Sequence, residues 1–197
     1  MRSSKVLIMV EGAMMIALAT VLSLMKVFTM PWGGSITLLS MLPIVLFSIR
    51  RGIKTGLAVS FLFSLTQLYQ GIGGGLFSWG LTPTMLIACI FLDYIIAFSV
   101  LGFAGILRKK GVKGWIFGVV FAIILRFITH VISGIVIWPE TGKFWEGFAT
   151  NNTIIYSLVY NSMYMLPELI FTTLAAVLLL KLPGVGKYLA KPIDDAN

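Results

Sequence analysis

The chain has 197 residues, of which 58% are hydrophobic and only 11% are charged, and its mean hydropathy is +0.99. Soluble domains carry about 25% charged residues, so this composition excludes an ordinary soluble protein and predicts one that is embedded in a lipid bilayer. The net charge of +8 comes without the interleaved basic and aromatic residues of a nucleic-acid-binding surface, so we expect no nucleic-acid partner.

Six apolar stretches follow one another along the sequence, and most are near the ~20 residues that a helix needs to cross a bilayer. They cover about 6–25, 36–49, 55–69, 84–107, 114–138 and 154–180. The second and third are short, so each crosses with little tilt or is completed by flanking loop residues. Since no repeat or linker divides the sequence, it predicts one integral membrane domain over residues 1–197, all-α, with six transmembrane helices.

Lysine and arginine residues are distributed unequally between the two ends of these spans. One side has Lys26 and Lys143, and the other has Arg2, Lys5, Arg50, Arg51, Lys54, Arg108, Lys109, Lys110, Lys113, Lys181, Lys187 and Lys191. Cytoplasmic loops near the ends of spans retain basic residues. We therefore predict a multi-pass protein of the bacterial cell membrane with both termini cytoplasmic, whose positive charge reflects this orientation and contact with anionic lipid.

Residues that build common enzyme sites are scarce. The sequence has one His and one Cys, which excludes a zinc cluster, and no Gly-x-x-x-x-Gly-Lys-Ser/Thr segment that could hold a nucleotide. No Ser-His-Asp arrangement stands out at helical spacing. We expect no catalytic residues, no metal and no cofactor, and a function other than catalysis.

The most informative residues are Asp93, Arg126 and His130, because they are ionisable and lie inside apolar stretches. A charge near the bilayer centre costs roughly +2.5 to +3.5 kcal/mol, so such residues usually face a bundle interior or a wet cavity. Arg126, His130, Gly134 and Trp138 recur every four residues and share a helix face. Two interpretations stay open: this face lines a binding pocket, or Arg126 pairs with Asp93 only to make both tolerable.

The last span carries a second polar face. Asn161, Tyr164 and Glu168 follow a three-then-four spacing, whereas Tyr156 is five residues before Asn161 and falls off that stripe. Pro167 removes a helix hydrogen bond, so we expect the local backbone to bend.

The predicted outer loops are rich in aromatic residues and poor in charge. These residues are Trp32, Phe77, Trp79, Phe144, Trp145 and Phe148. Rings near a buried carboxylate suit a flat, cationic heteroaromatic ligand, through stacking, cation–π attraction and one ion pair. For any single one of them, a place in the interfacial aromatic belt is the alternative.

A strip of small residues lies on the first span. Ala13 and Ala17 are four residues apart and, with Gly12, would let another helix approach closely, which drives helix association in lipid. That helix belongs either to a partner subunit or to another span of the same chain.

Several segments of the sequence resemble those of a known protein family. The segments are Glu11–Ala19, Met41–Ile44, Arg50–Gly52 with Thr55 and Gly56, Leu92–Tyr94, Arg126 with His130 and Trp138, Tyr156–Leu158 with Asn161, and Tyr164–Glu168. From Met1 to about Leu182 the chain resembles the substrate-binding S component of energy-coupling factor (ECF) vitamin transporters, most closely the thiamine-specific member. The first segments are similar to S components generally, and those of spans 4 to 6 point to thiamine.

The resemblance implies a six-helix bundle that binds thiamine near its outer surface and transports it only with a transmembrane coupling subunit and two cytoplasmic ATPase subunits. The thiamine contacts it implies are Asp93, Tyr94, His130, Trp138, Tyr156 and Asn161. Asp93 would face the positive charge of the vitamin, Arg126 would support that acid, and the strip of Ala13 and Ala17 would dock on the coupling subunit.

The sequence departs from the family pattern in two places. The family often has Glu where this chain has Asp93, which is one methylene shorter, and Trp32 is the candidate for the aromatic residue expected after span 1; Trp145 is a further loop candidate. Two other functions therefore remain: an S component for another vitamin or a thiamine precursor, and a self-sufficient small transporter. Secondary carriers often show internal repeats, and this sequence shows none.

Overall fold

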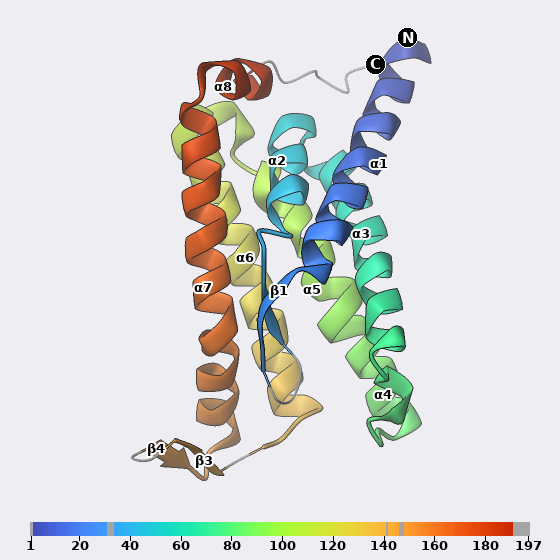
Figure 1. Ribbon diagram of the computed structural model, residues 1–197, viewed down its shortest axis with the longest axis vertical. Helices are drawn as coiled ribbons and strands as arrows, with labels where there is room; N and C mark the ends of the chain where they lie inside the picture. The colour runs from blue at the N-terminus through green and yellow to red at the C-terminus, as the bar shows by residue number, and fades with distance from the viewer. Residues whose placement is uncertain (1, 31–33, 141, 146–147, 191–197) are drawn as a thin grey trace.

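Long helices run side by side through most of the molecule, as the apolar stretches predict (Figure 1). The structure is a computed structural model that describes residues 2–30, 34–140, 142–145 and 148–190. Its helices are α1 (Arg2–Leu24), α2 (Leu42–Arg51), α3 (Ile53–Gly73), α4 (Pro83–Cys89), α5 (Ala97–Ser99), α6 (Gly111–Val136), α7 (Thr153–Lys181) and α8 (Pro183–Ala190). Shorter helical segments are η1 (Leu76–Ser78), the π-helical η2 (Ile90–Ile96), η3 (Val100–Gly105) and η4 (Arg108–Lys110).

The helices follow the predicted spans except in the second stretch. There the sequence analysis expected a helix over 36–49, whereas residues 36 and 37 belong to a strand and α2 begins at Leu42. With ten residues, α2 is about 15 Å long, half of a bilayer core. By length and composition, three helical stretches of the described chain can cross a membrane: 5–24, 83–136, which turns back at η4, and 153–181.

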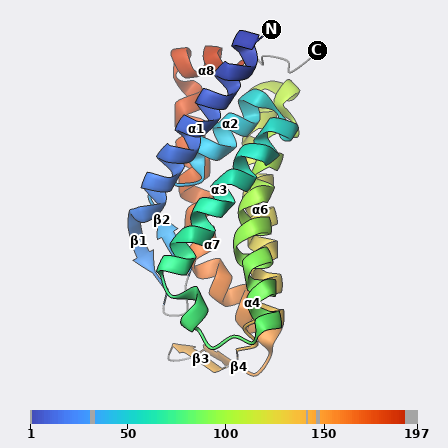
Figure 2. The same ribbon diagram turned by 90° about the vertical axis from the view of Figure 1, so that its right-hand side faces the viewer.

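Packing explains why α2 is apolar although it is short. Every residue of α2 except Leu46 is buried, and the helix lies in the middle of the bundle (Figure 2). Phe47 and Ile44 belong to the main core together with Phe63 of α3 and Ile123 of α6. The hydrophobic run at 36–49 therefore reflects burial inside protein rather than contact with lipid along a full span.

Two antiparallel hairpins interrupt the helices. Strands β1 (Lys26–Thr29) and β2 (Ser35–Thr37) pair between α1 and α2, and β3 (Gly142–Trp145) and β4 (Phe148–Thr150) pair between α6 and α7. Thr37 fastens the first hairpin to α7, because its backbone N–H and its hydroxyl donate to Glu168 Oε1 at 2.5 and 2.7 Å. Glu168 thus joins segments that are 131 residues apart.

Glycines bring α3 and η3 into backbone contact. A Cβ atom at Gly102 would lie 2.5 Å from the backbone N of Leu57, and one at Gly56 would lie 3.0 Å from the backbone oxygen of Gly102. Close approach of this kind gains dispersion energy where lipid supplies no hydrophobic force between helices.

An ion cluster closes the end of the bundle where α8 lies. The Glu11 carboxylate of α1 contacts Arg50, at 2.9 Å, and Arg51 of α2. The Tyr188 hydroxyl of α8 donates to Glu11 at 3.2 Å, and the Arg50 guanidinium lies 3.1 Å from the centre of the Tyr188 ring. Burial, and then the Glu11 carboxylate, raise the pKa of Tyr188, which keeps this hydroxyl a donor. The cluster ties α1, α2 and α8 together.

Substituting Gln for Glu11 should therefore destabilise the protein. The change leaves two buried guanidinium groups without their carboxylate, and breaking a buried ion pair in this way costs about 3–5 kcal/mol. A thermal unfolding scan in detergent should show a clearly lower Tm. Glu140→Gln removes an exposed carboxylate and is the matched control, expected to unfold like the wild type. Equal Tm values for the two variants would contradict a stabilising role for the cluster.

Candidate ligand-binding site

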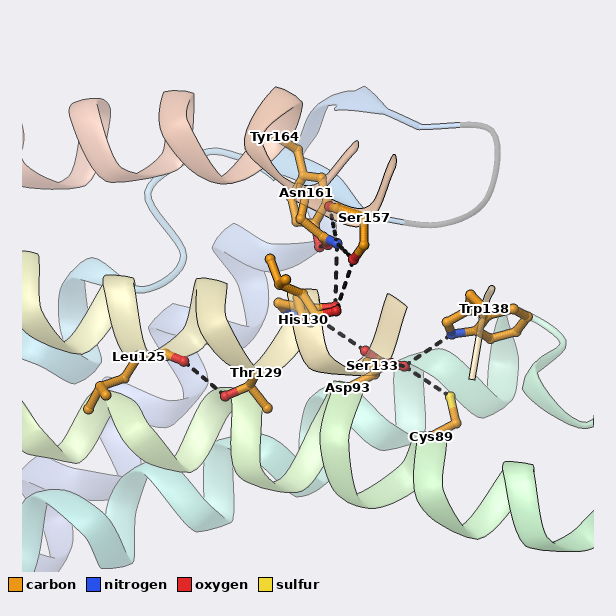
Figure 3. A network of polar contacts seen from close by, with 11 residues as sticks. Cys89, Asp93, Leu125, Thr129, His130, Ser133, Trp138, Ser157, Asn161 and Tyr164 are labelled. Carbon is orange, nitrogen blue, oxygen red and sulfur yellow. Dashed lines mark hydrogen bonds and ion pairs between the residues drawn. The ribbon is translucent and has the colours of Figure 1, made fainter. Parts of the chain in front are cut away.

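The site begins with an acidic residue on an unusual helical turn. Asp93 lies on η2, where the helix that starts at Pro83 widens to a π-helix. Such turns insert an extra residue, re-aim the side chains beside them and occur frequently at functional sites. The Asp93 side chain is 19% exposed and points toward α6 (Figure 3).

Four donors surround the Asp93 carboxylate (Figure 3). His130 Nδ1 lies 3.1 Å from Oδ1, and the Ser133 hydroxyl donates to Oδ2 at 2.6 Å. Trp138 Nε1 and the Cys89 thiol donate to Oδ2 at 3.4 and 3.3 Å. The carboxylate is satisfied by the imidazole and by neutral donors, and no lysine or arginine among the described residues pairs with it.

Asn161 extends this network from α6 to α7. Its Nδ2 donates to the backbone oxygen of His130 at 3.3 Å and to that of Ser157 at 2.9 Å. The Tyr164 hydroxyl donates to Asn161 Oδ1 at 2.6 Å, and the Tyr164 and His130 rings meet edge to face with centroids 6.0 Å apart. One network therefore connects η2, α6 and α7.

Gly134 makes this contact between α6 and α7 possible. A Cβ atom there would lie 3.0 Å from the Cβ of Ser157 and 3.3 Å from Asn161 Nδ2. The space beside Gly134 is therefore taken by the side chains of α7.

Aromatic rings flank the network on two sides. On α7, the Tyr156 and Tyr160 rings stack with centroids 6.4 Å apart, and Tyr160 meets Tyr164 edge to face at 6.3 Å. Tyr156 thus joins the site through a row of tyrosines four residues apart, although it is off the stripe of Asn161. On the other side, Trp138 meets Trp79 edge to face at 5.7 Å.

Tyr94, the neighbour of Asp93 in sequence, packs in a small apolar cluster beside the network. It is half-buried in the small apolar cluster that also holds Trp138, Leu76 and Ile137. The structure therefore places Tyr94 at the edge of the network.

Arg126 does not pair with Asp93, which corrects the expectation that it supports this acid. Its guanidinium lies 4.2 Å from the centre of the Phe98 ring, and Nη1 lies 2.8 Å from the Met41 sulfur. The carboxylate that acts on its charge is Glu168. Arg126 is four positions before His130 on α6, which is about 6 Å along the helix. It therefore lies one turn deeper than the groups that reach Asp93.

Three buried polar atoms near the network have no hydrogen-bond partner among the described residues. They are Nε2 of His130, Nε of Arg126 and Oε2 of Glu168. Unpaired buried polar groups are unfavourable and call for an explanation, such as a ligand or an ion. These atoms are available to a ligand that enters between η2, α6 and α7.

The structure unites part of the candidate set and leaves part outside. Asp93, His130, Trp138 and Asn161 share one network, with Tyr94 and Tyr156 at its rim. Trp32 lies outside the described residues, and so does the side chain of Trp145, whose backbone ends β3.

The sequence analysis missed four contributors, and helical spacing could have indicated each. Cys89 and Ser133 bind the Asp93 carboxylate, Ser157 accepts from Asn161, and Tyr160 stacks on Tyr156. Cys89 is four residues before Asp93, Ser133 three after His130, Ser157 four before Asn161, and Tyr160 four after Tyr156, which are spacings that bring side chains together on a helix.

Comparison with known proteins gives this arrangement a family. Residues 9–185 match the model of the family described as thiamine transporter protein (Thia_YuaJ). The chain belongs to this thiamine transporter family. The thiamine transporter ThiT of Bacillus subtilis (strain 168) is 38% identical over 196 residues, which cover 91% of this chain and 93% of that protein. The family consists of transporters, and the long apolar helices agree with a place in the membrane.

A solved structure of ThiT from Listeria monocytogenes has the same fold. It superposes with a TM-score of 0.74 over 94% of this chain and 98% of that chain, at 22% identity. The agreement extends over nearly the whole chain, so its helices form a bundle of an already known type.

The close contact at Gly134 leads to a stability prediction. Gly134→Ala should push Ser157 and Asn161 away from α6, and overpacking of this kind costs about 1–3 kcal/mol. Gly73→Ala is the matched control, because a Cβ at Gly73 meets no atom within 4 Å. In thermal unfolding scans the first variant should lose stability and the second should not. A Gly134→Ala protein as stable as the wild type would show that the α6–α7 contact is looser than described.

Proposed function

We propose that this chain is the thiamine-binding S component of an ECF-type importer. In this proposal it captures thiamine from outside the cell and delivers it through a transmembrane coupling subunit and two ATPase subunits, which alone hydrolyse ATP. The observation that carries the proposal is a partly buried carboxylate, Asp93, set among aromatic rings, an imidazole and neutral donors. Membership in the thiamine transporter family supports thiamine as the ligand.

Each group of the network matches one part of the vitamin. Thiamine has a permanently cationic thiazolium ring and a flat aminopyrimidine ring. Asp93 would face the cation, and Trp138 and Tyr94 would offer ring faces to it. His130 Nε2, which has no partner among the described residues, and Asn161 would bind polar atoms of the pyrimidine.

The remaining candidates lie around this centre. Tyr156 would close the rim on α7, and Trp32 and Trp145 stay candidates from the outer loops. Arg126 would act as a neighbouring charge one turn below the ligand, and not as the partner of Asp93.

We further propose six membrane passes with both termini in the cytoplasm. The second pass would consist of the first hairpin and α2 together, since α2 alone is too short. Two features support this orientation. Most of the described basic residues gather at the end of the bundle that holds α8 and η4, and the start of α1 lies at the same end in Figure 1. Cytoplasmic ends of spans are rich in basic residues.

Thiamine binding can be tested on the purified chain without partners. Thiamine stacking on Trp138 should quench tryptophan fluorescence, and a titration then gives the affinity. Asp93→Asn keeps the size of the side chain but removes its charge, so it should weaken thiamine binding by about 1.5–3 kcal/mol. Glu140→Gln removes an exposed carboxylate whose charge reaches only Tyr156 among the proposed ligand contacts, and should weaken thiamine binding far less than Asp93→Asn.

Two results would overturn the assignment. A folded Asp93→Asn protein with unchanged affinity would remove Asp93 from the ligand contacts. A response to a neutral vitamin without a response to thiamine would favour an S component for another substrate.

Docking of the coupling subunit would use the small-residue strip of α1. Ala13 and Ala17 are exposed, whereas Gly12 packs inward, since a Cβ there would lie 2.9 Å from Val59 Cγ2. Gly12 packs within the chain, whereas the alanines face outward among exposed apolar side chains such as Met9, which supports the docking proposal.

Replacing Ala13 and Ala17 together by Trp should leave thiamine affinity in detergent near the wild-type value but abolish uptake in cells that supply the partners, because bulk at the strip prevents close helix contact. The matched control replaces Met14 and Leu18, also exposed and four residues apart, by Trp and should retain uptake. Uptake that survives in the first variant would exclude this strip as the docking surface, and uptake without any partner subunits would indicate a self-sufficient transporter.

A further inference from the structure

A basic cavity of about 350 Å³ lies at the end of the bundle away from Asp93. It is formed by the end of α2, the start of α3 and the turn from η3 to η4. Its basic lining residues are Arg51, Lys54, Arg108 and Lys109, and none of the described residues that line it is acidic. The cavity therefore concentrates positive charge.

The backbone adds to this positive potential. α3 is a helix of 21 residues, and the N-cap residue that precedes it, Gly52, provides no side-chain cap for the first amides. These amides and the helix dipole favour an anion at this end. Gly52 has a φ of 90°, and a Cβ atom there would lie 3.0 Å from Cζ of Arg108. The missing side chain thus lets the Arg108 guanidinium lie over the start of α3.

One buried donor at this cavity lacks an acceptor. Arg51 shares the Glu11 carboxylate with Arg50, but its Nη1 has no hydrogen-bond partner among the described residues, although the side chain is fully buried. An unpaired buried donor is unfavourable and calls for an acceptor, such as an anion.

We infer that the cavity between Arg51, Lys54, Arg108 and Lys109 at the start of α3 binds a phosphate group. Guanidinium groups match the geometry of phosphate oxygens, and helix N-termini bind the same groups. Basic pockets between membrane helices at the cytoplasmic side bind phospholipid head groups. The phosphate belongs either to an anionic lipid or to a free phosphate ester. The inference does not depend on thiamine, since Asp93 lies at the other end of the bundle.

Lysine variants test the site without disturbing the core. Lys54 and Lys109 are exposed, so Lys54→Gln with Lys109→Gln should fold normally. Lys110→Gln with Lys113→Gln removes two equally exposed charges close by that do not line the cavity, and serves as the matched control.

The full chain, in a neutral detergent, would be titrated with short-chain phosphatidylglycerol, short-chain phosphatidylcholine and glycerol phosphate, with Tm and native mass spectrometry as readouts. Phosphatidylglycerol should bind and raise the Tm of the wild type. It should bind at least about tenfold more weakly to the cavity variant but within about twofold of wild type to the control variant, because each lysine near a lipid phosphate contributes appreciably.

Every outcome decides the inference. Binding of phosphatidylglycerol alone assigns the site to a lipid head group, and binding of glycerol phosphate as well assigns it to phosphate esters in general. An equal loss in both double variants would mean diffuse attraction and would overturn the site. No effect of any probe would overturn it too, and uptake lost in the cavity variant alone would then point to an acidic segment of a partner subunit.

Discussion

A carboxylate inside an apolar helix bundle has to be surrounded by donors, because an unpaired charge at that depth costs several kcal/mol. Asp93 meets this requirement with two side chains of α6, His130 and Ser133, and with Trp138, which follows the end of that helix. Those contacts determine how α6 is turned toward the widened helix at η2. The His130 backbone in turn accepts a hydrogen bond from Asn161 of α7. The need to satisfy one acid therefore arranges three helices and brings the candidate ligand-binding side chains together.

The bundle is organised in layers of different charge. Asp93 and the aromatic rings lie toward the end with the β3–β4 hairpin, and Arg126 and Glu168 form a layer below them. Glu168 also fastens the β1–β2 hairpin through Thr37, so this middle layer connects the helices to a loop. The opposite end is dominated by arginine and lysine. In the proposed orientation, the cationic vitamin meets an acid from outside, and the basic end meets anionic lipid inside.

Sequence reasoning reached the family, the long helices and most of the polar network, because apolar runs and fixed helical spacings survive folding. It did not find the short α2, since a buried apolar run looks the same as a lipid-facing one. It expected Arg126 to support Asp93. Avoiding this error would have required knowing the rotation of α6 and the extra residue in η2. The bond from Thr37 to Glu168 spans 131 residues and has no local signal.

The central claim is that the Asp93 carboxylate recognises the positive charge of thiamine. The most direct measurement compares thiamine with an isostere in which carbon replaces the charged thiazolium nitrogen, on the wild type and on Asp93→Asn. Wild-type protein should prefer thiamine by about tenfold or more, as a charge-assisted contact predicts, and the variant should lose that preference. An equal preference in both proteins would contradict the account.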